Sequence, residues 1–274
     1  MCKGKSTKNF FVADKICAGY GEKEIIHDIR FSIEPHTLTA LIGPNGCGKT
    51  TLLKSIVNLL DYKGTCTLQG EVLKDMSVQK LAKKISYIPQ RGGINISMPV
   101  MDVVLMGYNP VLKLLQRPSA GQIQKAREAL VMVGMSRYEK TDYLTLSEGQ
   151  KQLVLLARTM IEDTSLMILD EPDSALDFQN KHRILQLLEQ MIKKEEKAGI
   201  LCIHDPAVAL EFCQQLIVMK DGHCVEILRP ATDSLEVMEK VLRKIYGNVS
   251  LNRCTGKNGE DHLVLLWEGE KCDQ

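Results

Sequence analysis

The stretch from Gly43 to Thr51 has residue types and a spacing suited to phosphate binding. Its sequence, GPNGCGKTT, lies between the apolar run LTALI and the helix-like segment TLLKSIVNLL. Glycines allow backbone N–H groups to close around phosphate oxygens, and a helix N-terminus adds donors and a positive dipole end. We expect Lys49 to reach the β and γ phosphates of a nucleotide and the Thr50 hydroxyl to hold Mg²⁺. The residues expected to contact the nucleotide here are Gly43, Pro44, Asn45, Gly46, Cys47, Gly48, Lys49, Thr50 and Thr51.

A pair of carboxylates follows a second apolar run. Asp170 and Glu171 come directly after the residues LMIL. A buried strand delivers its last residues to the sheet edge where ligands bind in open α/β folds. Asp170 can then take Mg²⁺ directly or through water, and Glu171 can accept a proton from an attacking water. A charged turn at a strand end is the structural alternative, and the phosphate-binding stretch favours the catalytic interpretation.

Composition limits the classes of protein that the chain can belong to. The 274 residues suffice for one large domain or two modest ones, and the formal net charge of +1 gives no electrostatic case for nucleic acid. No apolar run approaches the roughly 20 residues that cross a bilayer, and we expect no signal peptide. Nine scattered cysteines without a C-x-x-C pair indicate a reducing compartment and small buried hydrophobic residues rather than disulfides or a metal site.

The order of apolar patterns predicts the elements that position these residues. Short strands fill the chain to about residue 73, a mainly helical region spans 91–145, and strands then alternate with helices. Such alternation implies a mainly parallel sheet with helices on both faces. We therefore predict an α/β core with a small antiparallel β subdomain and an inserted helical subdomain. Strands are expected at 10–20, 25–33, 38–42, 65–68, 71–73, 85–88, 166–169, 200–203, 216–219, 249–252 and 263–267, and helices at 51–60, 78–83, 100–107, 122–133, 149–161, 180–197, 206–213 and from Leu235.

The order of these motifs resembles that of ATP-binding cassette (ABC) ATPases, from Tyr20 to His204. Decisive is LSEGQ at Leu146–Gln150, which is similar to the family signature and is not found in P-loop kinases or GTPases. Physically it is a serine at a helix N-cap followed by glycine, a second N-terminus suited to an anion. The resemblance implies a P-loop NTPase core in a single domain that binds ATP and Mg²⁺. Its expected parts are a core with the antiparallel subdomain (1–90), a helical subdomain (91–162), the continued core (163–230) and a C-terminal extension (231–274).

By resemblance, three further positions acquire roles in the nucleotide site. Tyr20 would stack on adenine, and an aromatic residue at a β edge is its structural alternative. Gln90 in YIPQ would lie near Mg²⁺ and the attacking water, as a metal and nucleotide contact. His204, at the end of ILCIH, would contact the γ phosphate. Together with Lys49 and Glu171, His204 completes the catalytic set that the resemblance implies.

The resemblance also implies that two subunits share the nucleotides. Ser147, Gly149 and Gln150 of one subunit would cap the phosphate loop of the other, and SALD at Ser174–Asp177 would cross the interface. The expected partners are a second copy of this chain, integral membrane permease subunits and, indirectly, a substrate-binding protein. The expected location is the cytoplasmic face of the membrane, as a peripheral subunit.

Three positions carry more specific expectations. Glu148 replaces the glycine that is commoner in the signature, and we expect its side chain to point outward. Asp173 replaces the usual threonine or serine after DEP and would place a third carboxylate near the catalytic pair. Cys47 lies beside Lys49 and a helix N-terminus, which predicts a lowered thiol pKa and a reactive thiolate. The alternative for Cys47 is an inert, inward-packed residue.

The segment ISMPVMDVVLMGYNP and the residues HDPAVAL resemble the ATPases of iron-siderophore, haem and cobalamin importers. We therefore expect an ATP-hydrolysing subunit of a metal-chelate importer. We further expect the permease to contact the segment Met98–Gly107, with core packing as its alternative.

The rival function is a soluble cassette ATPase without a channel, for example in iron-sulfur cluster assembly. A module that binds nucleotide without turnover is disfavoured by Glu171 and His204.

Overall fold

The computed structural model describes residues 9–90, 94–113, 115–172, 174–194, 196–257 and 259–269. These residues form two compact units, one within Met1–Lys74 and Ile192–Gln274 and the other within Asp75–Met191. Because Asp173 lies outside the described residues, the third carboxylate expected at that position does so as well.

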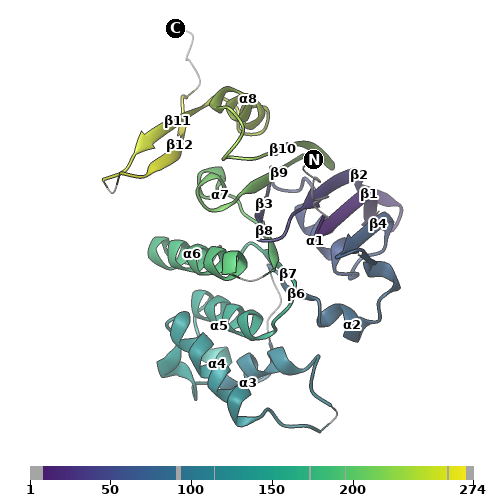
Figure 1. Ribbon diagram of the computed structural model, residues 1–274, viewed down its shortest axis with the longest axis vertical. Helices are drawn as coiled ribbons and strands as arrows, with labels where there is room; N and C mark the ends of the chain where they lie inside the picture. The colour runs from purple at the N-terminus through teal and green to yellow at the C-terminus, as the bar shows by residue number, and fades with distance from the viewer. Residues whose placement is uncertain are drawn as a thin grey trace, which may run out of the picture. The chain divides into compact units, whose positions relative to one another are not determined.

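A small antiparallel sheet makes up one layer of the first unit (Figure 1). Its order is β2-β1-β4-β5, and alternate residues of β2, namely Ile29, Phe31 and Ile33, are buried as the period of two predicts. The expected antiparallel subdomain is therefore confirmed. The strands are β1 (Phe11–Tyr20), β2 (Lys23–Ile33), β4 (Tyr62–Leu68) and β5 (Glu71–Val72).

The second layer of this unit is built on β3 (Leu38–Ile42), whose five residues are all buried. It lies between β8 (Ala198–Cys202) and β9 (Gln215–Lys220), and all three strands run parallel. β10 (His223–Leu228) pairs antiparallel with β9 and was not predicted from the sequence. The turn Asp221-Gly222 between β9 and β10 is the Asp-Gly pair that commonly marks a hairpin.

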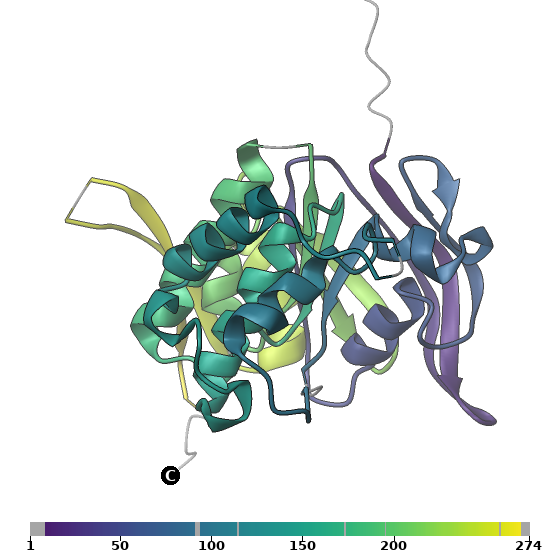
Figure 2. The same ribbon diagram turned by 90° about the horizontal axis from the view of Figure 1, so that it is seen from below.

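Three helices and a terminal hairpin complete the first unit. α1 (Lys49–Ile56) follows β3, and α7 (Pro206–Phe212) connects β8 to β9. α8 (Leu235–Tyr246) leads into the hairpin of β11 (Val249–Thr255) and β12 (Asp261–Trp267), which projects from the end of that helix (Figure 2). The helix and two strands expected in the C-terminal tail are thus present.

The second unit combines a pair of parallel strands with packed helices. β6 (Ile85–Ile88) pairs with β7 (Leu166–Asp170), which is buried throughout. Figure 2 shows α3, α4 and α5 gathered together, and they pack against one another. Val104 on α3 and Leu130 on α4 are buried. Its helices are α2 (Val78–Ala82), α3 (Val100–Leu105), η2 (Met106–Tyr108), α4 (Ala120–Met132), η3 (Ser136–Tyr138), η4 (Tyr143–Thr145) and α5 (Glu148–Ile161). η1 (Leu73–Asp75) begins before the first residue of this unit, and α6 (Phe178–Lys194) ends after its last.

The end of α6 differs from the prediction. The helix was expected to reach Lys197, with its charged end in water. It is described only to Lys194, and Lys197 is buried directly before β8. The Lys197 carbonyl accepts a hydrogen bond of 2.7 Å from the backbone N–H of His36, so this residue belongs to the entry into the sheet. No helix in the described ranges is long and apolar enough to cross a membrane.

Candidate nucleotide site

The phosphate loop is the connection from β3 to α1, and packing fixes its course on both sides. Gly48, the N-cap of α1, has φ 103°, a conformation that favours glycine. A Cβ atom on Gly48 would lie 2.4 Å from Ile26 Cγ2, and one on Gly43 would lie 2.2 Å from the Met219 carbonyl oxygen. Glycine is therefore required at both positions by neighbouring atoms as well as by the backbone.

Lys49 is the first residue of α1, and its ammonium group turns back onto the loop. Its Nζ donates to the carbonyl oxygens of Gly43 at 2.8 Å and Pro44 at 3.1 Å, and the residue is only 6% exposed. The first turn of α1 contains no acidic residue to offset the positive end of the helix dipole. A buried cation and an uncompensated helix N-terminus therefore face the same loop, which favours an anionic ligand.

The remaining loop residues divide by exposure. Pro44, Asn45 and Gly46 are exposed at the tip, whereas Cys47 and Thr51 are buried and Thr50 is half-buried. The exposed backbone at the tip can contact a ligand, and the buried residues hold the loop against the rest of the unit.

The β9–β10 turn ties the phosphate loop to the antiparallel sheet. The backbone N–H of Gly222 donates to the Cys47 carbonyl at 3.2 Å, and the Gly222 carbonyl accepts from the backbone N–H of His27 at 2.8 Å. The φ of Gly222 is 78°, and a Cβ there would lie 2.3 Å from the Ile25 carbonyl oxygen. This link was not anticipated from the sequence, although the Asp-Gly pair could have signalled it.

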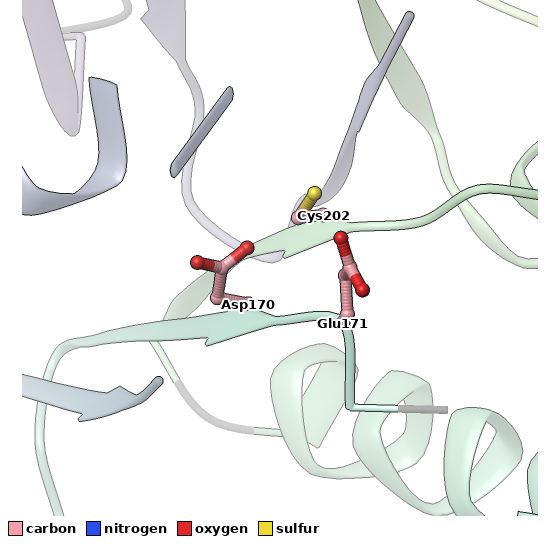
Figure 3. A group of neighbouring side chains, drawn as sticks. All are labelled: Asp170, Glu171 and Cys202. Carbon is pink, nitrogen blue, oxygen red and sulfur yellow. The ribbon is translucent and has the colours of Figure 1, made fainter. Parts of the chain in front are cut away.

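Asp170 and Glu171 stand at the end of β7, as predicted (Figure 3). Asp170 is completely buried, and Glu171 is 7% exposed with φ 53°, a left-handed conformation for a residue other than glycine. Such conformations cost about 1–3 kcal/mol and cluster at functional sites. The Gln90 side chain donates from Nε2 to Glu171 Oε2 at 2.5 Å, so the structure brings these two predicted residues together.

The signature residues begin α5. Ser147 is the N-cap, its Oγ accepts from the backbone N–H of Gln150, and the Gln150 side chain accepts from the Ser147 N–H at 3.0 Å. Gln150 also donates to the Tyr138 hydroxyl at 2.9 Å, so its side chain serves its own helix. A Cβ on Gly149 would lie 2.6 Å from the Ala175 carbonyl oxygen, which explains glycine there.

Glu148 points outward, as expected. Its side chain is 79% exposed and pairs with the Lys151 ammonium at 2.8 Å. An exposed pair of this kind contributes little stability, so the glutamate leaves the helix start intact.

Tyr20 and His204 are both accessible to a ligand. Tyr20 ends β1 and is 51% exposed, and Lys54 Nζ lies 6.0 Å from its ring centroid. The residue also lines an open hollow of about 560 Å³ together with Leu60 and Lys63. His204 is exposed, two residues after the end of β8.

Cys47 contradicts the expected thiolate. The residue is 5% exposed, and burial raises the pKa of its thiol, while the nearby Lys49 charge and the backbone N–H groups lower it less. The structure therefore agrees with the inward-packed alternative, and its low reactivity is a prediction. Among the described cysteines Cys66, Cys202 and Cys213 are also buried, and Cys254 is exposed.

Comparison with known proteins places this geometry in a family. The family model described as "ABC transporter" matches residues 26–174. The chain belongs to the ABC transporter family. The match confirms the resemblance of motifs, and the ATP-binding subunits of this family hydrolyse ATP. The α/β fold class is confirmed by the sheets described above and by solved structures of the same fold.

Relatives cover most of the chain. The iron(3+)-hydroxamate import ATP-binding protein FhuC of Bacillus subtilis is 31% identical over 87% of this chain and 88% of its own length. The hemin import ATP-binding protein HmuV of Deinococcus radiodurans is 31% identical over 82% and 85%. The manganese transport ATP-binding protein MntB of Bacillus subtilis is 32% identical over 85% and 91%.

Solved structures share the fold. An inward-facing metal-chelate type ABC transporter superposes with a TM-score of 0.78 at 22% identity, covering 95% of this chain and 99% of that one. The dimeric cassette MJ0796 with bound ADP and Pi superposes with a TM-score of 0.71 at 24% identity, covering 80% and 98%.

The burial of Cys47 predicts slow alkylation. In the folded protein without nucleotide, N-ethylmaleimide should modify Cys254 well before Cys47, because Cys254 is exposed and the raised pKa of Cys47 leaves little thiolate at neutral pH. Timed labelling with peptide mass spectrometry measures both rates in one sample. A Cys47 rate equal to that of Cys254 would contradict the packing described here.

Proposed function

We propose that this chain is the ATP-hydrolysing subunit of an importer for metal chelates such as iron-siderophore, haem or cobalamin complexes. The observation that carries the binding of ATP phosphates is the buried Lys49 ammonium on the Gly43 and Pro44 carbonyls at the start of α1. Relatives named as iron-hydroxamate and hemin import proteins support the substrate class.

The proposed chemistry relies on position and charge, because phosphoryl transfer needs little covalent help. Lys49 binds the β and γ phosphates, and Tyr20 stacks on adenine. Glu171, oriented by Gln90, polarises the attacking water, and His204 contacts the γ phosphate. The phosphate loop binds the remaining phosphate oxygens through its backbone N–H groups.

The residues proposed for Mg²⁺ fit a hard cation. Asp170 offers carboxylate oxygens, and Thr50 and Gln90 offer neutral oxygens, which together are the ligand types that Mg²⁺ prefers. Asp170 is completely buried at the end of β7, where its carboxylate is a hard oxygen ligand of the kind that a divalent cation takes. When bound, Mg²⁺ neutralises charge on the phosphates.

A second copy of the chain completes the proposed enzyme. Ser147 and the Gly149 backbone, at the N-terminus of α5, present donors suited to the phosphates held by the other copy. The Gln150 side chain bonds to Ser147 and Tyr138, so in this proposal it shapes the start of the helix. The segment 174–177 lies at the same interface.

The proposed membrane partners are integral permease subunits, which receive the substrate from a binding protein. This chain would bind them from the cytoplasmic face of the membrane. The proposed contact is the segment Met98–Gly107. Val100, Met101, Val103 and Val104 on α3 are buried, so core packing accounts for most of its apolar residues. The contact surface then consists of its exposed or half-buried positions, together with the adjacent Ile96, which is 67% exposed. Those positions are Met98, Pro99, Asp102, Leu105 and Met106.

Removal of the proposed base should separate binding from turnover. Glu171→Gln should keep MgATP binding and lose hydrolysis by roughly 10²-fold or more, because the amide cannot accept the proton of the attacking water. With MgATP, light scattering should show a stable dimer of the variant. The matched control Glu128→Gln changes an exposed glutamate on α4 and should hydrolyse like wild type. A fully active Glu171→Gln protein would remove Glu171 from this role.

Crosslinking tests the proposed permease contact. Single cysteines at Ile96, Asp102 and Met106, in a background depleted of other reactive thiols, should capture the permease in membranes. Leu59, on the first unit and 66% exposed, is the control position and should not crosslink. Equal capture from Leu59, or no capture from any of the three positions, would place the contact elsewhere.

A further inference from the structure

Two histidine rings lie next to each other on the first unit, outside the residues assigned to the nucleotide. His27 is on β2 and His223 is the first residue of β10, and their ring centroids are 5.0 Å apart with the ring planes inclined by 30°. The His27 side chain is 37% exposed, and His223 is exposed as well. Both rings are therefore accessible to a small solute.

The backbone fixes the spacing of the two rings. The N–H of His27 donates at 2.8 Å to the carbonyl of Gly222, the residue before His223, and the Gly222 N–H donates to the Cys47 carbonyl. A Cβ atom on Gly222 would lie 2.8 Å from His27 Cδ2, so glycine lets the imidazole approach the turn closely. Hydrogen-bonded strands and a fixed turn thus hold both rings, as a preorganised binding site requires.

Glu24 orients one of the rings. Its Oε1 lies 2.8 Å from His27 Nδ1. An ionised carboxylate only accepts hydrogen bonds, so Nδ1 carries the proton and Nε2 of the neutral ring keeps its lone pair. Metal-binding histidines commonly donate their second N–H to a carboxylate, which fixes the tautomer and the direction of the ring. The pair of Glu24 and His27 has this arrangement.

The separation of the rings suits a shared metal ion. Two imidazoles bound to one ion by bonds of about 2.1 Å, at a roughly tetrahedral angle, have ring centroids about 5 Å apart. Imidazole nitrogen is a good ligand for Zn²⁺, Cu²⁺ and Ni²⁺, whereas Mg²⁺ and Ca²⁺ take oxygen ligands. The histidine pair therefore favours a transition metal over the Mg²⁺ proposed for the nucleotide.

We propose that His27 and His223 form a binding site for one divalent transition-metal ion such as Ni²⁺ or Zn²⁺, with Glu24 as the residue that orients His27. The rings supply two ligands, and water completes the coordination of the ion. The ion would join β2 to β10 across the Gly222 turn, which also holds the phosphate loop at Cys47. Stacking of the two rings without a metal is the alternative.

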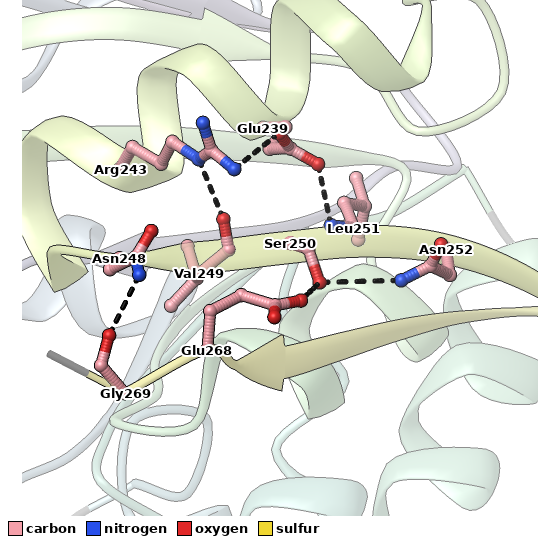
Figure 4. A network of polar contacts seen from close by, with 9 residues as sticks. All are labelled: Glu239, Arg243, Asn248, Val249, Ser250, Leu251, Asn252, Glu268 and Gly269. Carbon is pink, nitrogen blue, oxygen red and sulfur yellow. Dashed lines mark hydrogen bonds and ion pairs between the residues drawn. The ribbon is translucent and has the colours of Figure 1, made fainter. Parts of the chain in front are cut away.

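An exposed thiol would also bind the metal, so the test uses the full-length Cys254→Ser protein as its background. Cys254 is exposed on β11 and lies opposite His262 on β12. The polar network of Figure 4 fastens this hairpin at its other end, where Arg243 Nε donates to the Val249 carbonyl at 2.7 Å. Replacing one exposed thiol by a hydroxyl should therefore leave the hairpin folded.

Calorimetric titration of Ni²⁺ near neutral pH, without nucleotide, measures the proposed site. Loss of an orienting partner alone costs metal sites about 10–100-fold in affinity, so His27→Gln and His223→Gln, which each remove a ligand, should raise the Kd at least about tenfold. Glu24→Gln should raise it about tenfold. The matched control His182→Gln changes a histidine on α6 that bonds to its own helix, and it should bind like the background protein. Ni²⁺ bound elsewhere is common to all variants.

Diethyl pyrocarbonate, which acylates accessible imidazoles, locates the ion by peptide mass spectrometry. Ni²⁺ should protect His27 and His223 and leave the modification of His182 unchanged. Either His27→Gln or His223→Gln binding Ni²⁺ as tightly as the background protein would overturn the inference and leave ring stacking as the explanation. Equal modification of both rings with and without Ni²⁺ would overturn it as well. Unchanged affinity in Glu24→Gln would overturn the orienting role of Glu24.

Discussion

The buried ammonium group of Lys49, held by two carbonyl oxygens of its own loop, is the interaction on which the candidate site depends. Removing an ammonium group from water costs several kcal/mol, and hydrogen bonds to neutral carbonyls offset only part of that cost. The N-terminus of α1 adds further positive potential that no acidic residue in its first turn compensates. The positive potential at the loop is therefore not compensated by these neighbouring groups. A polyphosphate brings the negative charge that compensates it, and a neutral ligand does not.

The surrounding backbone keeps that charge in place. β3 delivers the loop from the centre of three parallel strands, and the Gly222 turn joins the loop at Cys47 to β2 at His27. In the second unit, Glu171 has a left-handed backbone conformation with a positive φ, and its side chain accepts a hydrogen bond from Gln90. Both features fix a carboxylate at the end of a buried strand. Each unit thus holds its own part of the chemistry on rigid elements, which is what a mechanism based on positioning requires.

Much of this arrangement was predictable, because the strongest sequence signals have local physical causes. The glycine pattern requires the loop at 43–51, the run LMIL places Asp170 and Glu171 at a strand end, and Ser147 caps its helix as the sequence indicates. Predictions based on local charge alone were weaker. Cys47 neighbours a lysine and a helix start, yet burial outweighs both, and burial is a property of the assembled fold. The tie through Gly222 joins residues far apart in sequence, so no local pattern reveals the contact.

The most direct test of the central claim is calorimetric titration of MgATP into wild-type protein and into Lys49→Met, which keeps the length of the side chain and removes its charge. Wild type should bind MgATP, and the variant, although folded as judged by circular dichroism, should lose at least about tenfold in affinity, since charged hydrogen bonds contribute roughly 1.5–3 kcal/mol. A folded Lys49→Met protein that binds MgATP as tightly as wild type would contradict that claim.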